Sequence, residues 1–391
     1  MILAVITVAA LLDSNHTYWN DPWPSAVDIA RQTALLGIFS LGAAVVIVSG
    51  GIDLSVGSMI AFAGTTCASI MVLLAPREMR EALPVGTGVI SAAILGTVAA
   101  GFLVGSLHAW LISVVRLPPF VATLATLVGL RSLGRAVTEA VTVAKFGGKS
   151  TQIQIYDEAF RYLATSVWIP VLVFILLSLV VSFLLRRTVL GRHIYALGGN
   201  EAAARLSGIR TDQVRWVAYS IGALTSAIAG ILYIAEQSVA EPQTLGRAYE
   251  LNAIAAAVVG GCSLKGGVGS VAGTVLGALF LRVVIDGIAK VIKTGADVYE
   301  GLVVGLVVVT AVAFSQFRRA RAGGRELFAG ALGSVTLLAL ALVAGLLASL
   351  MAAPAAGYVA APTVLALLAA VKVIENRRRK AQRVAAGEGE R

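Results

Sequence analysis

The chain is poor in charged residues, in proline and in cysteine. Only 13% of its 391 residues are charged, about half the usual share of a soluble protein, and only 10 are proline and 2 cysteine. Hydrophobic residues make up 58%, and the mean hydropathy is +0.87. This composition excludes a soluble globular enzyme, a disordered chain and a secreted disulfide scaffold. Because both cysteines lie in apolar surroundings, neither a disulfide nor a cysteine metal site is expected.

Motifs for nucleotide binding, catalysis and secretion are also missing. The sequence has no Walker-type phosphate loop, so uphill transport would draw its energy from an ion gradient or from a partner. The histidines His16, His108 and His193 are scattered, and no nucleophile–base pair or metal-ligand set accompanies them. Residues 1–12 are apolar but lack the basic n-region and the cleavage site of a signal peptide. We therefore expect neither an enzyme nor a cofactor.

Uncharged apolar segments fill most of the chain instead. A helix that spans a bilayer needs ~20 apolar residues. Candidate spans cover 33–52, 54–76, 85–115, 117–130, 168–185, 216–235, 266–281, 301–317, 327–351 and 355–371. Residues 252–264 are too few to cross alone, and residues 1–12 make only half a span. The sequence predicts an all-α, polytopic transmembrane bundle with broken helices: a transmembrane domain over 1–317, a C-terminal hairpin within 318–374 and a basic tail over 375–391.

Arginines gather in a few connecting segments and so predict the orientation of the chain. Segment 186–215 carries six arginines, segment 318–325 carries four, and the tail carries three more with one lysine at 377–380. The positive-inside rule places these segments in the cytoplasm. Segment 13–30 has three aspartates and no lysine or arginine, so it should lie outside. The net charge of +10 is explained by these anchors beside membrane lipid, and nucleic acid is not an expected partner.

Two glycine-rich breaks resemble each other, and each lies between apolar runs. They cover residues 50–58 and 260–270 and share a leucine and a Val-Gly-Ser sequence. Such breaks indicate a transport site. An Asp at mid-membrane costs ~3 kcal/mol on insertion scales, so Asp53 should face a polar cavity, cap a broken helix or lie at the interface. Asp53 or Ser55 could cap a helix that begins near Leu54, and direct contact with a substrate is the alternative. The candidate pathway residues are Asp53, Ser55, Ser58, Asn252 and Ser263.

The second informative segment is residues 191–209. It predicts a short helix with Asn200 as its N-cap and Gly208 just beyond its C-terminus. Two turns of helix are marginal alone in water, so a defined helix here needs a surface to dock on. Ala203 and Leu206, three residues apart, give it a small apolar stripe. The alternative is a basic loop on the membrane surface.

At these residues the chain resembles the permease subunits of ribose/xylose-type ABC sugar importers. The matching motifs are GGIDLSVGS (50–58), LPPFVATLATL (117–127), GRHIYALGGNEAAARLSGI (191–209) and YELNAIAAAVVGGCSLKGGVGSVAGTVLGA (249–278) within residues 30–317. The resemblance implies about ten core spans in a bacterial-type inner membrane and a homodimer or paralogous heterodimer of permeases. It also implies two ATPase subunits inside and a solute-binding protein outside. Segment 198–208 would be the helix that sits in a cleft of the ATPase, and the residues implied in coupling are Gly191, Arg192, Tyr195, Gly199, Asn200, Glu201, Ala203, Arg205, Leu206 and Gly208.

The chain departs from the family pattern in four places. Residues 1–12 are a truncated first span, which implies a late start or a shortened helix. Outside segment 138–166 matches poorly, and it bears on the contact with the binding protein. Arg282, Asp286 and Lys290 form a charged stripe where relatives usually carry Gly and Asn; it marks either the outer end of a helix or the pathway. Residues 318–391 extend beyond the usual end.

The sequence as a whole predicts the membrane-spanning permease subunit of an ATP-driven importer for a monosaccharide or related polyol. One alternative is a permease of the same fold for nucleosides or branched-chain amino acids. Another is an ion-coupled secondary transporter in which Asp53 binds a proton or cation. A membrane-embedded enzyme is disfavoured by the missing catalytic set.

Overall fold

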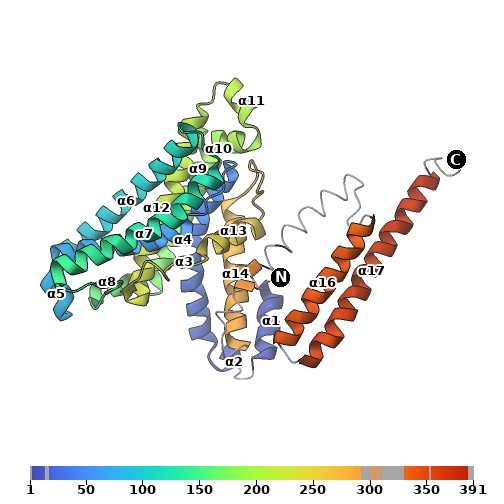
Figure 1. Ribbon diagram of the computed structural model, residues 1–391, viewed down its shortest axis with the longest axis horizontal. Coiled ribbons are helices and arrows are strands. Elements are labelled where there is room, and N and C mark those ends of the chain that lie inside the picture. The colour runs from blue at the N-terminus through green and yellow to red at the C-terminus, as the bar shows by residue number, and fades with distance from the viewer. Residues whose placement is uncertain are drawn as a thin grey trace. The chain divides into compact units, whose positions relative to one another are not determined.

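The computed structural model describes residues 2–13, 17–291, 301, 302, 304, 305, 309, 330–351 and 354–385. The chain divides into two compact units, Met1–Val309 and Thr310–Arg391 (Figure 1). The expected span 301–317 falls largely outside the described residues. The fold is a polytopic helical membrane bundle, as predicted.

Long helices build the first unit. Its helices are α1 (Ile2–Leu12), α2 (Thr17–Asn20), α3 (Pro22–Val48), α4 (Val56–Leu74), α5 (Pro76–Glu81), α6 (Thr87–Ser113), α7 (Pro119–Phe146), α8 (Glu158–Thr165), α9 (Trp168–Arg187), α10 (Val189–Gly199), α11 (Glu201–Leu206), α12 (Thr211–Gln237), α13 (Tyr249–Val259) and α14 (Val271–Val291). Within the described residues seven are long and apolar enough to cross a membrane: α3, α4, α6, α7, α9, α12 and α14.

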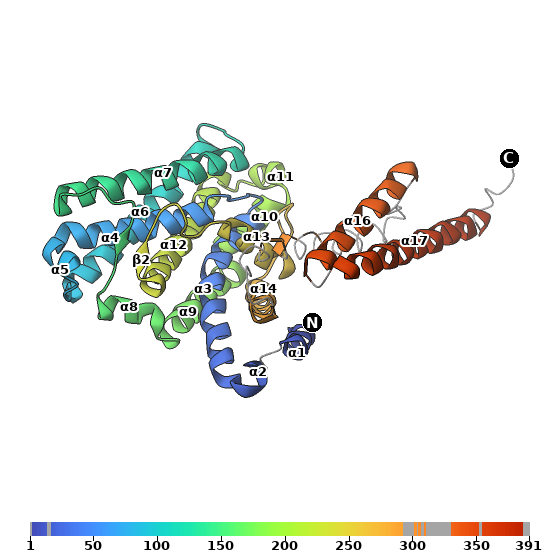
Figure 2. The ribbon, with the colours of Figure 1, turned by 60° about the horizontal axis from the view of Figure 1, so that its bottom comes forward.

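The core of this unit lies around α12, which packs against α3, α4 and α6 (Figures 1 and 2). Glycines allow these backbones to approach closely, as is common between helices in lipid. A Cβ on Gly42 of α3 would overlap Thr225 Oγ1 and lie 2.9 Å from the Cα of Gly222 on α12. On the opposite side, a Cβ on Gly105 of α6 would lie 2.7 Å from the Cα of Ser220. Helix α9, by contrast, exposes a row of large apolar side chains that suit contact with lipid: Leu172, Leu176, Leu179 and Phe183.

Helix α7 is longer than the sequence predicts. The uncharged run ends at Leu130, but the helix continues to Phe146 through Arg131, Arg135 and Glu139. These charges are tolerated because each has a partner. Arg135 pairs with Glu139 at 2.8 Å, and Arg131 Nη1 donates hydrogen bonds of 3.0 Å to the carbonyl oxygens of Pro242 and Leu245. An uncharged stretch is thus a poor guide to the end of a span whose charges face protein.

The carbonyls that Arg131 binds belong to the non-helical segment between α12 and α13. Strand β2 (Val239–Ala240) pairs antiparallel with β1 (Ile153–Gln154), residues 241–248 then run without helix, and the short helix α13 follows. Gly246, at φ +64°, packs its backbone against Gly57 near the start of α4. Non-helical backbone inside a membrane protein must have its polar groups satisfied by protein, and Arg131 does so here.

The charged stripe on α14 ties this helix to the segment before and at the start of α3. Lys290 Nζ lies 3.2 Å from Asp286 Oδ2, 2.9 Å from Ser25 Oγ and 3.9 Å from the centre of the Tyr18 ring. The Tyr18 hydroxyl donates to Asp286 at 2.6 Å. These contacts lie at the end of α14 remote from the 260–270 break, so the stripe has structural partners.

The second unit contains α16 (Gly330–Met351) and α17 (Pro354–Ala385), which pack along each other. A Cβ on Gly345 would lie 2.6 Å from the Cβ of Ala361, so the two helices are in close contact. Helix α17 continues past the expected end of the hairpin at 374 and takes in the first part of the basic tail.

Candidate translocation and coupling site

Three glycine-rich segments meet at one contact, which we call the glycine junction. It consists of Gly50 after α3, Gly198 in the last turn of α10, and Gly266 and Gly267 in the second break. Gly267 N–H donates to the carbonyl oxygen of Val48 at 2.9 Å. A Cβ on Gly198 would overlap that oxygen and lie 2.5 Å from Gly267 N. The two breaks and the segment that precedes α11 are therefore joined backbone to backbone.

Three of the four junction glycines also need unusual backbone angles. Gly50 and Gly266 each have φ +85° and Gly267 has φ +71°, in the left-handed region that only glycine adopts without strain. A Cβ on Gly266 would in addition lie 2.7 Å from the Cα of Gly50. Close approach and backbone conformation thus both require glycine at this point.

A side-chain hydrogen bond reinforces the contact between α10 and the second break. The Tyr195 hydroxyl donates to the carbonyl oxygen of Gly269 at 2.8 Å. Burial raises the pKa of Tyr195 above its usual value, so the hydroxyl keeps its proton for this bond. Ser263, a predicted pathway residue, is half-buried in the same loop, where its N–H donates to Val268 O at 2.9 Å.

The first break is held by a compact polar network. Asp53 is only 4% exposed, and its Oδ1 accepts hydrogen bonds from the N–H of Ser55 at 2.8 Å and the hydroxyl of Ser55 at 2.6 Å. Ser58 Oγ donates to Ser55 O at 2.8 Å. Helix α4 begins at Val56, later than the expected start near Leu54. The carboxylate thus accepts from Ser55, which is the N-cap residue of α4 and makes no side-chain capping bond itself, so Asp53 binds the loop before the helix and does not cap it.

Sequence reasoning missed the residue that anchors this loop to α7. Leu54 N–H donates to Thr123 Oγ1 at 3.1 Å, across 69 positions of sequence. Thr123 is fully buried in the first turns of α7, just after the Pro118-Pro119 pair. Its place within the 117–127 motif was the available signal. Asn252, in the helix that precedes the second break, is buried in the first turn of α13.

The short helix expected after residue 200 is confirmed as α11. Asn200 is its N-cap and accepts from the N–H of Ala203 at 3.0 Å, while Gly208, at φ +82°, follows its end. Leu206 is 90% exposed. Ion pairs fasten the helix to α12: Glu201 to Arg215 at 2.8 Å and Arg205 to Asp212 at 3.9 Å. Helix α11 thus exposes the apolar side chain of Leu206 while its ion pairs hold it against α12.

The remaining coupling candidates fall on α10 and around α11. Gly191, in the first turn of α10, is buried against the carbonyls that end α9, where a Cβ would overlap Leu184 O. Arg192 is exposed, and a Cβ on Gly199 would meet no atom within 4 Å. Gly198, which makes the junction, was not among the predicted residues, because adjacent glycines give no sign of which one is packed.

A cavity of about 580 Å³, which we call the vestibule, links α11 to the first break. Its walls come from residues 49–51, the turn between α6 and α7, residues 197–201 and α12. The charged residues among the lining are Arg116, Glu201, Arg205, Asp212, Arg215 and Lys265. The ring of Tyr219 lines it beside Gly51. This is the cavity that reaches from the predicted coupling segment to the broken helices.

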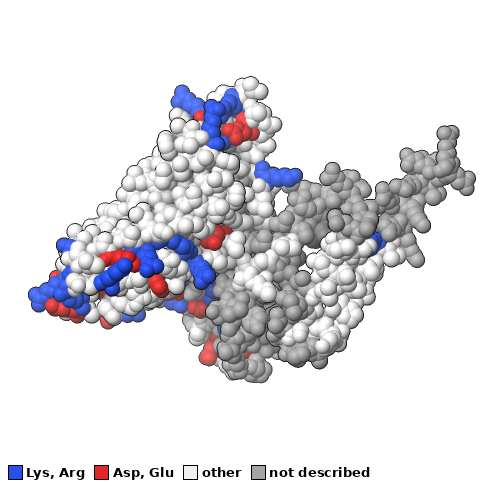
Figure 3. Space-filling view, viewed as in Figure 1, with Lys and Arg blue, Asp and Glu red and all other residues white. Residues whose placement is uncertain are grey.

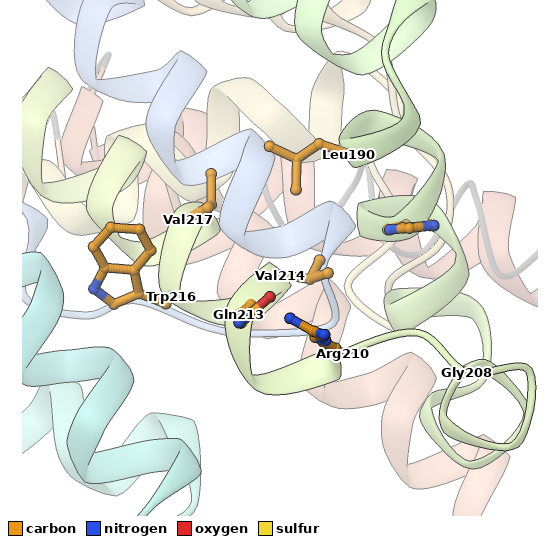
Figure 4. Close-up of a pocket in the computed structure, with 8 residues that line it drawn as sticks. Leu190, Gly208, Arg210, Gln213, Val214, Trp216 and Val217 are labelled. Atoms are coloured by element: carbon orange, nitrogen blue, oxygen red, sulfur yellow. The ribbon is translucent and has the colours of Figure 1, made fainter.

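A second cavity, of about 490 Å³, opens between α10 and α12 (Figure 4). Leu190, Val214 and Val217 supply its apolar walls, with Trp216 at one side and Arg210 at the other. It includes no residue of either break, so the vestibule is the better candidate for the transport path.

Charged side chains gather at two ends of the first unit, as expected for a protein that spans a membrane. Figure 3 shows Lys, Arg, Asp and Glu gathered around α10 and α11 and again at the opposite end of the long helices near α5, with a largely uncharged band between. The chain is a multi-pass membrane protein.

Comparison with known proteins agrees with this geometry. A family model described as "Branched-chain amino acid transport system / permease component" matches residues 25–312. The chain belongs to this family. The permease is 36% identical over 310 residues to the ribose import permease protein RbsC of Escherichia coli (strain K12), covering 79% of this chain and 89% of that protein. It is 33% identical over 286 residues to RbsC of Bacillus subtilis (strain 168), covering 73% and 83%.

The chain is also similar to the permease protein of a xylose transport system. The xylose transport system permease protein XylH of Escherichia coli (strain K12) is 32% identical over 317 residues, covering 67% of this permease and 77% of that protein. No solved structure gives a significant match. The family match stops at residue 312, so the α16–α17 unit lies beyond it.

Proposed function

We propose that this permease is the membrane-spanning subunit of an ATP-driven importer for a monosaccharide or a related polyol. The sugar class rests on the ribose and xylose permeases to which the chain is similar. The transport mechanism rests on the glycine junction, which joins the segment before α11 to both broken spans. The subunit performs no bond chemistry itself, and ATP is hydrolysed on separate ATPase subunits in the cytoplasm.

The exposed tip of α11 is the proposed docking point for an ATPase. Leu206 offers the apolar contact, and the ion pairs of Glu201 and Arg205 keep the helix rigid on α12. When the ATPase moves α11, the displacement reaches Gly198 through the last turn of α10. Because Gly198 touches the backbone on both sides of the junction, the two breaks would shift together and change access to the vestibule.

The proposed assembly has three further components. A second permease copy completes a homodimer or a paralogous heterodimer, two ATPase subunits bind inside, and a solute-binding protein delivers the sugar outside, all in a bacterial-type inner membrane. We place transport in residues 1–317, with the hairpin in 318–374 and the tail 375–391 as additions. Asp53, Ser55, Ser58, Asn252 and Ser263 remain the proposed pathway residues.

The substrate class is best tested on the solute-binding protein encoded with this permease. Calorimetric titration with ribose, xylose, a polyol, a nucleoside and a branched-chain amino acid should detect binding of a sugar or polyol only. Tight binding of a nucleoside or of leucine, with no sugar bound, would favour the other permeases of this family.

A further inference from the structure

Two buried polar atoms beside the first break have no hydrogen-bond partner among the described residues. They are Nδ1 of His108 on α6 and the hydroxyl oxygen of Tyr219 on α12. Both side chains are fully buried, with ring centres 6.1 Å apart and ring planes inclined at 63°. An unpartnered polar group in a protein interior is destabilising and calls for a functional reason.

Only one ring nitrogen of His108 has a hydrogen-bond partner within the described part of the chain. Its Nε2 lies 2.7 Å from Thr126 Oγ1. The Thr126 hydroxyl donates its own proton along the helix, to the carbonyl of Thr123 at 3.0 Å. With this arrangement Nε2 is the donor in the pair with Thr126 and Nδ1 of the neutral ring is an acceptor; in either tautomer Nδ1 has no partner among the residues that the structure describes.

The Tyr219 hydroxyl points at the glycine-rich loop of the first break. A Cβ on Gly51 would overlap this hydroxyl, so glycine at position 51 is what leaves room for it. The tyrosine also lines the vestibule. Asp53 Oδ2 lies 3.6 Å from the Cβ position of Gly222, one turn along α12 from Tyr219. The unpartnered Nδ1, the unpartnered hydroxyl and the carboxylate thus lie around one part of α12, and of the three residues Tyr219 lines the vestibule.

This set of groups matches the chemistry of a polyhydroxylated ligand. Each sugar hydroxyl offers one donor and two acceptor lone pairs. One hydroxyl can donate to His108 Nδ1 while a neighbouring hydroxyl accepts the proton of Tyr219. A metal ion is a poorer fit, because no group of three or more His, Cys, Asp or Glu side chains suited to a metal occurs in the described part of the chain.

We propose that His108, Tyr219 and Asp53 form a hydroxyl-binding station at which the sugar is held before it leaves through the vestibule. The proposal rests on the proposed function and adds to it the residues that contact the substrate's hydroxyl groups. Asp53 was a pathway candidate already; His108 and Tyr219 are new. Nδ1 of His108 and the hydroxyl of Tyr219 have no hydrogen-bond partner in the described residues of the protein, and a passing sugar would supply one to each. These hydrogen bonds would favour brief binding of the sugar at this point.

The test uses the complete transporter in proteoliposomes, with ATP accessible to the ATPases and saturating sugar-loaded binding protein. The readout is sugar imported per ATP hydrolysed, together with the thermal midpoint of each purified permease. Tyr219→Phe removes only the free hydroxyl. His108→Gln can keep a donor for Thr126, but its amide oxygen does not occupy the position of Nδ1, so the acceptor is displaced from that point. Ser178→Ala on α9 removes another buried hydroxyl without a partner, away from the vestibule, and is the matched control.

We expect Tyr219→Phe and His108→Gln each to lower the import ratio, the amount of sugar imported per ATP hydrolysed, about three- to ten-fold. This factor corresponds to the free energy of one hydrogen bond. The thermal midpoint of Tyr219→Phe should equal or exceed that of the wild type, because no bond within the protein is lost. Ser178→Ala should match the wild type in both measurements.

Two results would overturn the station. One is an unchanged import ratio in both variants while the wild type imports sugar. The other is a lower thermal midpoint for Tyr219→Phe, which would mean that its hydroxyl has a structural partner. If the wild type imports an amino acid or a nucleoside and no sugar or polyol, the proposed function itself is wrong, and the station for sugar hydroxyls is refuted with it.

Discussion

Replacing Gly198 by alanine should uncouple the broken spans from α10. The added Cβ would overlap the carbonyl oxygen of Val48 and lie 2.5 Å from Gly267 N, and both neighbours are backbone that cannot rotate away. Overpacking of this kind typically costs ~1–3 kcal/mol. Relief by separation would stretch the 2.9 Å bond from Gly267 N–H to Val48 O, and losing it costs about 1 kcal/mol more. We therefore expect a total destabilisation of ~2–4 kcal/mol.

The adjacent glycine is the matched control for this substitution. A Cβ added to Gly199 would have no atom within 4 Å, so Gly199→Ala introduces a methyl group into open space in the same helix turn. Its effect on stability should stay within about 0.5 kcal/mol. Any difference between the two variants then reports the junction and not the helical propensity of alanine.

The assay compares thermal unfolding of the two purified variants and their ATP-dependent uptake in vesicles. Gly198→Ala should unfold at a clearly lower temperature and transport little, even at normal membrane levels. Gly199→Ala should unfold at the temperature of the wild type, because its methyl group meets no neighbour. Equal stability and equal uptake for the two variants would refute the close contact at Gly198 and the coupling route built on it.

Three more predictions concern the coupling helix, the topology and the C-terminal unit. Glu201→Arg breaks the 2.8 Å pair with Arg215 and places positive charge at the N-terminus of α11, so it should impair uptake and ATPase stimulation by loaded binding protein while the permease still inserts; wild-type stimulation would remove α11 from the mechanism. A cysteine in place of Arg205 should react with a membrane-impermeant thiol reagent only from the cytoplasmic side, and labelling from outside intact cells would contradict the orientation. A chain ending after residue 323 should still assemble with the ATPases and transport, because the family match ends at residue 312; loss of uptake at normal expression would show that the α16–α17 unit has a role in transport.

Local patterns in the sequence predicted the features that depend on neighbouring residues. The caps of α11 are one example, since Asn200 and Gly208 act within a few positions of the helix they bound. The two glycine-rich breaks are another, because apolar runs flank each of them. Asp53 was correctly identified as a buried carboxylate that needs polar partners, and Ser55 supplies them.

Features that depend on distant contacts could not be read from the sequence. The uncharged run in α7 stops at Arg131, and only the fold shows that this side chain binds carbonyls more than 100 residues away. The same is true of Thr123, which anchors the first break, and of Gly198, which looks identical to Gly199 until its surroundings are known. Spacing along one chain carries no information on which glycine another backbone approaches.

The central claim is that ATP, and not an ion gradient, drives transport. It is tested most directly by measuring sugar uptake with ATP alone and with a pH gradient alone, in the wild type and in Asp53→Asn. Asp53 Oδ1 accepts two hydrogen bonds from Ser55, and an asparagine carbonyl can accept the same bonds. We predict that sugar uptake requires ATP, survives a protonophore, persists in part in Asp53→Asn and is mostly lost in Asp53→Leu. Uptake in ATP-free proteoliposomes that follows an imposed pH gradient, and that Asp53→Asn abolishes, would instead identify an ion-coupled transporter and contradict the account.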